Sequence, residues 1–314
     1  MSARLAWIGS TPAMLAGFAL LAAALAAAHA DAGAPSWIIV APLALLALNL
    51  AAAIAAHPRL RRGGLGVFHV ALLALMIVAA AGRLARFEGR VEMAEGAALD
   101  PSAVEELTRG PLHRFAMPAE AFVQGPISVR YRPGVKRAHT RSEVSVPGED
   151  GSAATRVVGD DEPLVVAGYR FYTTHNKGFA PILTWQPASG RAQTGALHLP
   201  SYPLFDWRQE NRWRPPGAGE LRVWLRLDEP LAEDRAWTLE PRSARGVLVV
   251  QAQGTRAELR EGEELRLEGG TLRYERLAGW MGYRVFFDPT LPWLLGLALA
   301  AAAGLAAYLW KRRP

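Results

Sequence analysis

The sequence predicts a membrane protein of mixed α and β structure, with four transmembrane helices and a large β-rich extracytoplasmic domain. Three observations support this fold class. Four apolar segments approach the ~20 residues that cross a bilayer, three near the N-terminus and one at the C-terminus. Arginine and lysine cluster in short stretches beside those segments. The long region between the third and fourth segments consists of short alternating runs separated by turn residues.

The four apolar segments cover residues 12–30, 37–56, 65–82 and 291–310. Alanine dominates the first, which follows Arg4 and ends in Ala28-His29-Ala30. An A-x-A ending of this kind also fits a cleaved signal peptide. We expect a retained helix, and the cleaved signal peptide stays open as the alternative.

The positive residues predict the topology. Arg59, Arg61 and Arg62 lie in the short loop after the second segment, and 311–313 is a basic tail after the fourth. Short positive loops beside a span remain in the cytoplasm. We therefore expect both termini inside, a membrane region at 1–82, an extracytoplasmic domain at 83–290, and a final helix with a basic tail at 291–314.

His69 is the only ionisable side chain within the third segment. At 1.5 Å per residue it lies roughly 7 Å inside the end at Gly64. Hydrocarbon penalises an imidazole unless it faces a partner helix, a water-filled cavity or a ligand. Leu65, Leu72 and Met76 share its helix face, and such an aliphatic surface suits a haem. His69 is therefore either a haem ligand or a hydrogen-bonding group between helices.

The remaining histidines show no metal-ligand spacing. We expect His29 and His57 at the membrane boundaries, where they can reach water. The histidines of the central region, which we expect to be exposed or half-buried, are His113, His139, His175 and His198.

Several function classes are excluded or disfavoured. The absence of cysteine excludes a disulfide framework, a CxxC metal site and haem attachment to this chain through CxxCH. The net charge of +6 is dispersed, so we expect no nucleic-acid partner. No P-loop, GxSxG or dinucleotide motif is present. Adjacent acidic pairs, which we expect on a solvated surface, are Glu105-Glu106, Asp160-Asp161 and Glu263-Glu264.

The alternating runs of the central region predict mostly strands. We expect one short helix at 102–108, a polar loop at 145–155 and a long packed loop at 202–219. Turns are expected at Glu95-Gly96, Glu261-Gly262 and Gly269-Gly270. The predicted strands are 90–93, 127–132, 164–167, 169–173, 182–186, 221–227, 247–252, 256–259, 264–267, 271–274 and 283–287.

Three blocks resemble the ResB (CcsB) subunit of System II cytochrome c biogenesis. The first runs from Phe68-His69 through Gly82 to 87–91 and 94–96. The second is 162–172 followed by Lys177-Gly178, and the third is Gly279-Trp280 through 288–289 into the last segment. Their order, with three spans, a β-rich domain and a final span, matches over nearly the whole length.

The resemblance implies a function at the bacterial inner membrane, with the main domain in the periplasm. Such a subunit pairs with a multi-span partner of the ResC (CcsA) type, exports haem b and delivers it to apocytochrome c. A histidine in this span is thought to ligate the haem iron, and here that position is His69. The chain lacks the partner's tryptophan-rich haem motif, so it would contribute to a cytochrome c synthase without being an enzyme alone.

Two other functions remain open at this stage. The chain could be a membrane scaffold without haem, in which His69 joins helices, or a reduced paralogue with another assembly task. It could also be a b-type haem electron carrier, which would need a second ligand at matching depth. No other segment supplies a mid-membrane histidine.

Overall fold

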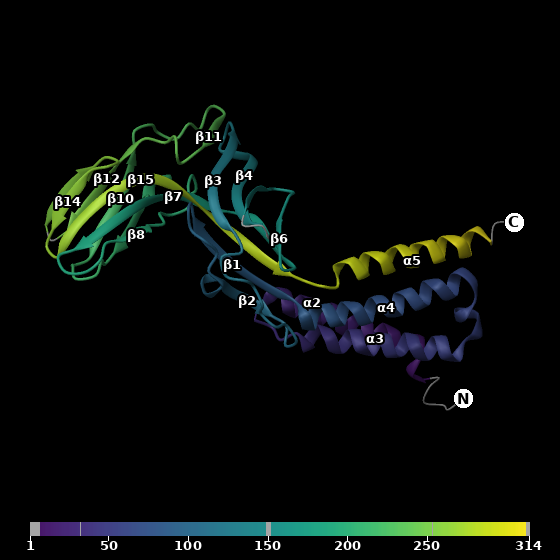
Figure 1. The fold of residues 1–314 in the computed structure, drawn as a ribbon. Coiled ribbons are helices and arrows are strands. Elements are labelled where there is room, and N and C mark those ends of the chain that lie inside the picture. The colour runs from purple at the N-terminus through teal and green to yellow at the C-terminus, as the bar shows by residue number, and fades with distance from the viewer. Residues whose placement is uncertain (1–6, 32, 149–151, 253, 312–314) are drawn as a thin grey trace. The chain divides into compact units, whose positions relative to one another are not determined.

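The computed structural model describes residues 7–31, 33–148, 152–252 and 254–311. Within these ranges it contains four helices that are long and apolar enough to cross a membrane. Three antiparallel β-sheets occupy the sequence between the third and fourth helices (Figure 1). The predicted combination of membrane helices and β structure is therefore confirmed.

The four long helices lie close to their predicted positions. They are α2 (Thr11–Ala30), α3 (Trp37–Ala56), α4 (Gly63–Ala85) and α5 (Leu291–Trp310), with a short 3₁₀ turn, η1 (Pro58–Arg61), between α3 and α4. α4 is longer than the predicted 65–82. Its hydrogen bonds continue through Arg83 and Leu84 until β1 begins at Phe87.

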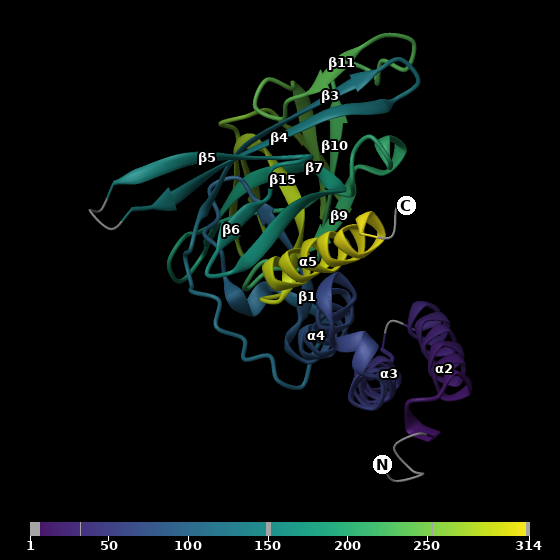
Figure 2. The same cartoon turned by 90° about the vertical axis from the view of Figure 1, so that its right-hand side faces the viewer.

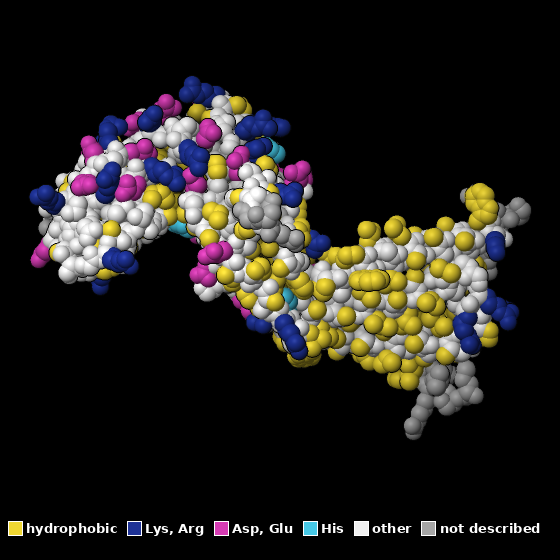
Figure 3. Space-filling model, in the orientation of Figure 1, with side chains coloured by type: hydrophobic (Ala, Val, Ile, Leu, Met, Phe, Trp, Pro, Cys, Tyr) yellow, Lys and Arg dark blue, Asp and Glu magenta, His cyan; other side chains and the backbone are white. Residues whose placement is uncertain are grey.

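The described chain forms two compact units. One contains 1–89, 106–116 and 286–314, and therefore α2 to α5. The other contains 90–105 and 117–285, and therefore most of the strands. Hydrophobic side chains dominate the surface over the helices, whereas charged side chains are frequent over the sheets (Figure 3).

Small residues allow the helices to approach closely. A Cβ added to Gly64 of α4 would lie 2.7 Å from the backbone nitrogen of Tyr308 in α5. One added to Gly304 of α5 would lie 2.8 Å from the backbone nitrogen of Phe68. Close backbone approach at glycine is typical of membrane helix pairs. Figure 2 shows the helices side by side.

α2 is joined to α3 by packing and by a buried amide. A Cβ at Gly17 would lie 2.7 Å from the Leu46 side chain. Asn49 of α3 is buried, and its Nδ2 donates to the carbonyl oxygens of Ile8 at 2.5 Å and Ser10 at 3.1 Å. Both acceptors lie just before α2. This segment therefore satisfies the Asn49 amide, which lipid would leave unpaired.

The largest sheet has seven described strands. Its order is β2-β1-β15-β7-β6, with β14 also paired to β15 and β8 also paired to β7. The strands are β1 (Phe87–Ala94), β2 (Glu105–Arg109), β6 (Leu164–Val166), β7 (Tyr169–Pro187), β8 (Gln193–Ala196), β14 (Glu264–Leu267) and β15 (Gly270–Phe287).

The two smaller sheets each have four described strands. The first has the order β13-β12-β10-β9, from β9 (Glu210–Trp213), β10 (Leu221–Leu227), β12 (Gly246–Ala252) and β13 (Thr255–Leu259). The second has the order β11-β3-β4-β5, from β3 (Val123–Arg132), β4 (Lys136–Pro147), β5 (Ala153–Gly159) and β11 (Trp237–Leu239).

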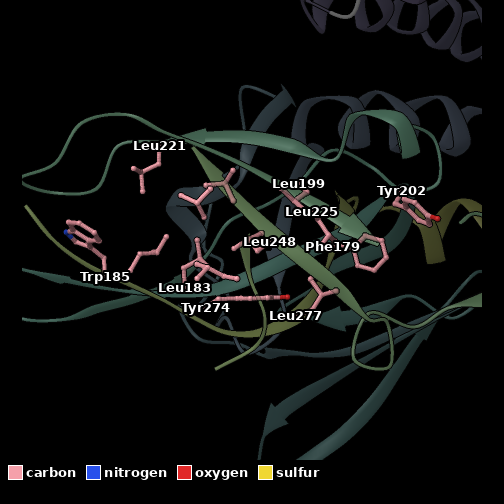
Figure 4. Close-up of a cluster of buried hydrophobic side chains, with 14 of the residues drawn as sticks. Phe179, Leu183, Trp185, Leu199, Tyr202, Leu221, Leu225, Leu248, Tyr274 and Leu277 are labelled. Atoms are coloured by element: carbon pink, nitrogen blue, oxygen red, sulfur yellow. The ribbon is translucent and has the colours of Figure 1, made fainter. Parts of the chain in front are cut away.

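The main core of the β-rich unit contains apolar side chains from all three sheets. Trp185 and Phe179 come from β7, Tyr274 from β15, Leu225 from β10, and Leu239 from β11. Figure 4 shows this cluster along the crossing strands. Alternation along β10 buries one face of the strand, as the period of two predicts, whereas β12 is buried on both faces from Val247 to Val250.

Several sequence predictions about the β-rich region are wrong. Residues 102–108 do not form a helix, because a 3₁₀ turn, η2 (Pro101–Ala103), is followed directly by β2. The Asp100 carboxylate accepts a hydrogen bond from the Ser102 backbone N–H at 2.8 Å. Asp100 is therefore a cap, as expected, but the turn that it caps does not continue into a helix. The predicted loop at 145–155 contains the end of β4 and the start of β5, while its residues 149–151 lie outside the described ranges.

The predicted loop at 202–219 is mostly irregular but contains the turn η3 (Asp206–Arg208) and strand β9. The predicted strands 169–173 and 182–186 are parts of one continuous strand, β7. Likewise, 271–274 and 283–287 both belong to β15. The three predicted turns are confirmed, with φ of +90°, +86° and +92° at Gly96, Gly262 and Gly269.

Candidate functional site

His69 lies in the second turn of α4, where the helix itself orients the imidazole. Its Nδ1 is 2.7 Å from the carbonyl oxygen of Leu65. A carbonyl oxygen can only accept a hydrogen bond, so Nδ1 carries the proton. In a neutral imidazole the lone pair then resides on Nε2. The backbone of α4 therefore selects the tautomer that presents Nε2 as a possible ligand.

The surroundings of His69 are apolar. The ring is half-buried, and Phe68 meets it edge to face at a centroid distance of 5.1 Å. No described residue gives Nε2 a hydrogen bond. Metal-ligating imidazoles share this arrangement, in which one ring nitrogen donates to a carbonyl oxygen, as Nδ1 does here, and the other, Nε2, is left for the metal.

The face of α4 that carries His69 is not the face packed on α5. Gly64, which contacts α5, lies about 140° around the helix from His69 at 100° per residue. Val70 and Ile77, about 100° and 80° from His69, are 57% and 56% exposed. An apolar group could approach the imidazole from this open side of the helix.

The other helix-associated histidines do not join His69. His29 lies in the last turn of α2 and His57 caps α3, and both are exposed. Among the described residues no group of three or more His, Asp or Glu side chains could hold a metal ion. His69 of α4 is therefore a separate candidate from these two histidines at the helix ends.

The histidine at position 113 is more buried than the sequence predicts. It is 6% exposed and stacks on Phe87 at a centroid distance of 5.1 Å, with Phe287 edge to face at 5.0 Å. Its Nδ1 donates to the carbonyl oxygen of Ala85 at 3.1 Å. Burial lowers the pKa of His113. These contacts give the imidazole a structural role beside the end of α4.

The remaining histidines fit the expected exposed or half-buried positions. His139 and His175 are exposed, and the nearby Arg137 guanidinium is the main cause of a lowered pKa at His175. His198 is half-buried and stacks on Trp280, with centroids 5.4 Å apart and planes at 6°.

The acidic pairs mostly form surface ion pairs. Glu105 binds Arg90 at 2.9 Å and Glu264 lies 3.4 Å from Arg273. Asp160 is less exposed, lies 3.2 Å from Arg137, and accepts the Thr140 backbone N–H at 3.0 Å. One carboxylate of each pair thus binds a basic side chain, as expected of a solvated surface and not of an acid–base couple.

Residues from two separated sequence blocks meet in the β-rich unit. The Trp280 indole of β15 donates to the carbonyl oxygen of Leu199 at 3.0 Å. A Cβ added to Gly178 of β7 would lie 3.0 Å from that indole nitrogen and 3.1 Å from the carbonyl oxygen of Pro200. Glycine at 178 is therefore required for the segment 199–200 to pack against both long strands.

The burial of two charged side chains was not predicted from the sequence. Lys177 is 2% exposed, and its Nζ donates to the carbonyl oxygen of His175 at 3.2 Å. Burial lowers its pKa to about 8. Glu95 is also buried and binds Arg242 at 2.7 Å and Arg276 at 3.0 Å. The sequence places Glu95 before a turn glycine but does not indicate these two arginine partners, which are distant in sequence.

The model of the ResB-like family matches residues 49–314, which include α4 with His69, the β-rich region and α5. No curated protein matches the chain at a significant level.

Proposed function

The chain belongs to the ResB-like family, and we propose that it is the subunit of a membrane complex that exports haem and delivers it to apocytochrome c. Family membership implies a role in cytochrome c biogenesis. The haem-handling role of this particular chain rests on one observation, which is the orientation of His69 by the carbonyl of Leu65.

The residues around His69 fit a haem. A haem face needs a nitrogen ligand with a free lone pair and flat apolar surface beside it. The tautomer of His69 supplies the first, and the same helix face supplies Leu65, Leu72 and Met76. Iron coordination would also satisfy the Nε2 of His69 in a lipid medium, where an unpaired imidazole nitrogen is costly.

The proposed topology places the basic end of the helical bundle in the cytoplasm. Arg59, Arg61, Arg62 and Lys311 are exposed, and basic side chains gather at one end of the helices in Figure 3. Positive residues in short loops and tails beside a membrane span favour the cytoplasmic side. His69, only two turns from this end, would then meet haem that enters from the cytoplasm, and the β-rich region would lie outside, in the periplasm.

A second membrane protein is part of this proposal. The ResB-like family usually acts with a partner of the CcsA (ResC) type. The described bundle offers one mid-membrane histidine, and the open side of α4 near Val70 and Ile77 leaves room for a partner helix. We propose that the partner supplies the opposite ligand and the site of haem attachment, and that the chain alone is not an enzyme.

The experiment compares His69→Ala with His57→Ala in the chain purified together with its membrane partner. Haem content is measured by absorption spectroscopy and by pyridine extraction. We expect His69→Ala to lower the haem per complex at least about tenfold, while His57→Ala, at the exposed cap of α3, leaves it unchanged. Equal haem content in both variants would reject His69 as the ligand. A wild-type complex without haem would favour a scaffold.

A further inference from the structure

The segment 109–115, which follows β2, covers the last turn of α4 and belongs to the same compact unit. The backbone N–H of Leu112 donates to the carbonyl oxygen of Leu84 at 2.9 Å, and the backbone N–H of Gly110 donates to that of Arg86 at 2.8 Å. The last carbonyl groups of a helix have no partner within the helix. These hydrogen bonds therefore satisfy the end of α4 and hold the segment 109–115 against it.

The segment 109–115 lies at the depth of lipid headgroups. Residues 84–86, which it contacts, lie about 3–6 Å beyond the end of the apolar stretch at Gly82, at 1.5 Å per residue. The headgroup layer on each side of a bilayer is about 5–7 Å thick. Trp37 and Trp293, at the starts of α3 and α5, are exposed near the same end of the bundle. Tryptophan is enriched at membrane boundaries, so these side chains mark the same level.

The outer surface of the segment 109–115 combines apolar and basic side chains. Leu112 is 67% exposed, and Pro111 beside it is exposed as well. Arg114 is exposed and has no ion-pair partner among the residues that the structure describes. At a membrane boundary, apolar side chains contact acyl chains while a guanidinium binds phosphate.

Two more arginines of this region have donors left over. Glu88 interacts electrostatically with Arg83, yet the buried Nε of Arg83 has no hydrogen-bond partner within the described ranges. Arg109 lies 3.5 Å from Glu106 and donates to the carbonyl oxygen of His113 at 3.2 Å. A guanidinium has five N–H donors, so these contacts leave donors free for an anion.

Arginine at this end of α4 calls for a local anion. In the topology proposed above, this end faces the periplasm, whereas arginine gathers in cytoplasmic loops. Asp288, the acid just before α5, already accepts two hydrogen bonds from Thr290. The anion that every bilayer supplies at this depth is the lipid phosphate, which a guanidinium can bind through two parallel hydrogen bonds.

We propose that the segment 109–115 and the end of α4 form a binding site for the headgroup of an anionic phospholipid. Arg114 binds the phosphate, Arg83 adds positive charge at the same depth, and Leu112 contacts the acyl chains. Basic sites beside membrane helices recognise anionic lipids in this way. A zwitterionic lipid also carries a cationic group, which these arginines repel, so the site prefers phosphatidylglycerol to phosphatidylcholine. The proposal does not depend on haem or on the membrane partner.

The test uses the absence of cysteine in the chain. Leu112→Cys is labelled with the fluorophore NBD in the full-length protein in detergent micelles. The protein is titrated with phosphatidylglycerol, with phosphatidylcholine of the same acyl chains, and with inorganic phosphate. We expect the NBD emission to rise and saturate at a phosphatidylglycerol concentration at least about tenfold below that of phosphatidylcholine, the scale of one charge-assisted hydrogen bond. Inorganic phosphate should leave the emission unchanged, because it brings no acyl chain to position 112.

Variants at Arg114 identify the group that binds the phosphate. In the labelled protein, Arg114→Gln should lower the affinity for phosphatidylglycerol about tenfold, and Arg114→Lys, which retains the charge, should keep most of it. The matched control is Arg62→Gln, which alters an exposed arginine at the other end of α4 and should have no effect. Circular dichroism of the three variants should match that of the parent protein.

Three results would overturn the proposal. Equal affinities for the two lipids would show that the site does not recognise a negative headgroup. Saturation by inorganic phosphate would assign the site to a soluble anion. Equal affinities of Arg114→Gln and Arg62→Gln for phosphatidylglycerol would remove Arg114 from the site. In nanodiscs, a phospholipid with a nitroxide on its headgroup should also quench NBD at position 112, and unquenched emission would place the segment 109–115 away from the bilayer.

Discussion

The Nδ1 of His69 lies 2.7 Å from the carbonyl oxygen of Leu65, one turn earlier in α4. The contact lies within a single helix, so it forms before any partner binds. It fixes both the orientation of the ring and the nitrogen that carries the proton. The haem-ligand proposal depends on this relationship, because it leaves Nε2 available.

The first prediction concerns this tautomer. In the haem-free protein labelled with ¹⁵N-histidine, the His69 ring should show a protonated Nδ1 and an unprotonated Nε2. The signal is assigned by its loss in His69→Gln. A protonated Nε2 would contradict the hydrogen bond to Leu65 and would remove the free lone pair.

The second prediction concerns the first helix. Because Asn49 donates to the carbonyl oxygens of Ile8 and Ser10, we expect the segment before and within α2 to remain in the mature protein. Intact mass spectrometry of the purified protein should show residues 1–30. A mass that corresponds to a chain beginning at Asp31 would establish cleavage after the Ala28-His29-Ala30 sequence.

Asn49→Leu provides an independent measure of the same contact. The variant removes two hydrogen bonds that connect α3 to the start of α2. We expect a loss of about 1 kcal/mol in the stability of the helical bundle, the usual scale for polar contacts between membrane helices. Leu48→Ala, at an exposed position of the same helix, is the control.

A third prediction follows from the buried Lys177, whose pKa is lowered from 10.5 to about 8. Below about pH 8 the folded protein must bury an ammonium group that the unfolded chain exposes to water. This cost is fully present at pH 7, declines as the pH rises from 8 to 10.5, and disappears above that range. Lys177→Met should therefore stabilise the β-rich unit at pH 7, by up to about 3 kcal/mol.

The measurement is chemical unfolding of wild type and Lys177→Met between pH 7 and 9.5, followed by near-ultraviolet circular dichroism. The advantage of the variant should shrink steadily with rising pH. Arg137 and Asp160 also act on the Lys177 pKa, in opposite directions, so both residues are left intact. An advantage that does not change with pH would show that the ammonium is not the origin of the effect.

A fourth prediction concerns Glu95, whose buried carboxylate binds Arg242 and Arg276. Glu95→Ala should destabilise the β-rich unit by about 2 kcal/mol, because the charge-assisted hydrogen bonds of a buried carboxylate are lost, while the half-exposed guanidinium groups regain water. Glu105→Ala breaks the exposed pair with Arg90 and should cost less than about 1 kcal/mol. Similar costs for the two variants would argue against a special role for Glu95.

The sequence was most informative where one local signal determined the structure. The apolar segments predicted all four long helices, and the isolation of His69 among aliphatic residues identified the candidate ligand. Glycines directly after a glutamate marked turns that require positive φ, at Gly96, Gly262 and Gly269. These features depend on residues within a few positions of each other.

Other features depend on contacts between distant residues. Lys177 and Gly178 interrupt the apolar alternation of β7, so two strands were predicted where one exists. The strand continues because Gly178 accepts the close approach of Pro200 and Trp280. Gly279 interrupts the alternation of β15 in the same way. A Cβ added to Gly279 would lie 2.7 Å from the Ile127 side chain.

Strand β11 was also not predicted from the sequence. It has only three residues, and it is held by pairing with the distant strand β3. β4 was missed for a different reason, since its first four residues are exposed and its charged positions hide the alternation. Propensity alone does not identify strands whose stability comes from sheet pairing.

The most direct test of the haem-ligand role is rescue by free imidazole. In the complex with the membrane partner, His69→Gly removes the side chain and leaves a space at the proposed haem face. Added imidazole should restore the wild-type haem absorption spectrum in His69→Gly, and should not change the spectrum of His57→Gly. A wild-type spectrum in His69→Gly without imidazole would contradict ligation of the haem iron by His69.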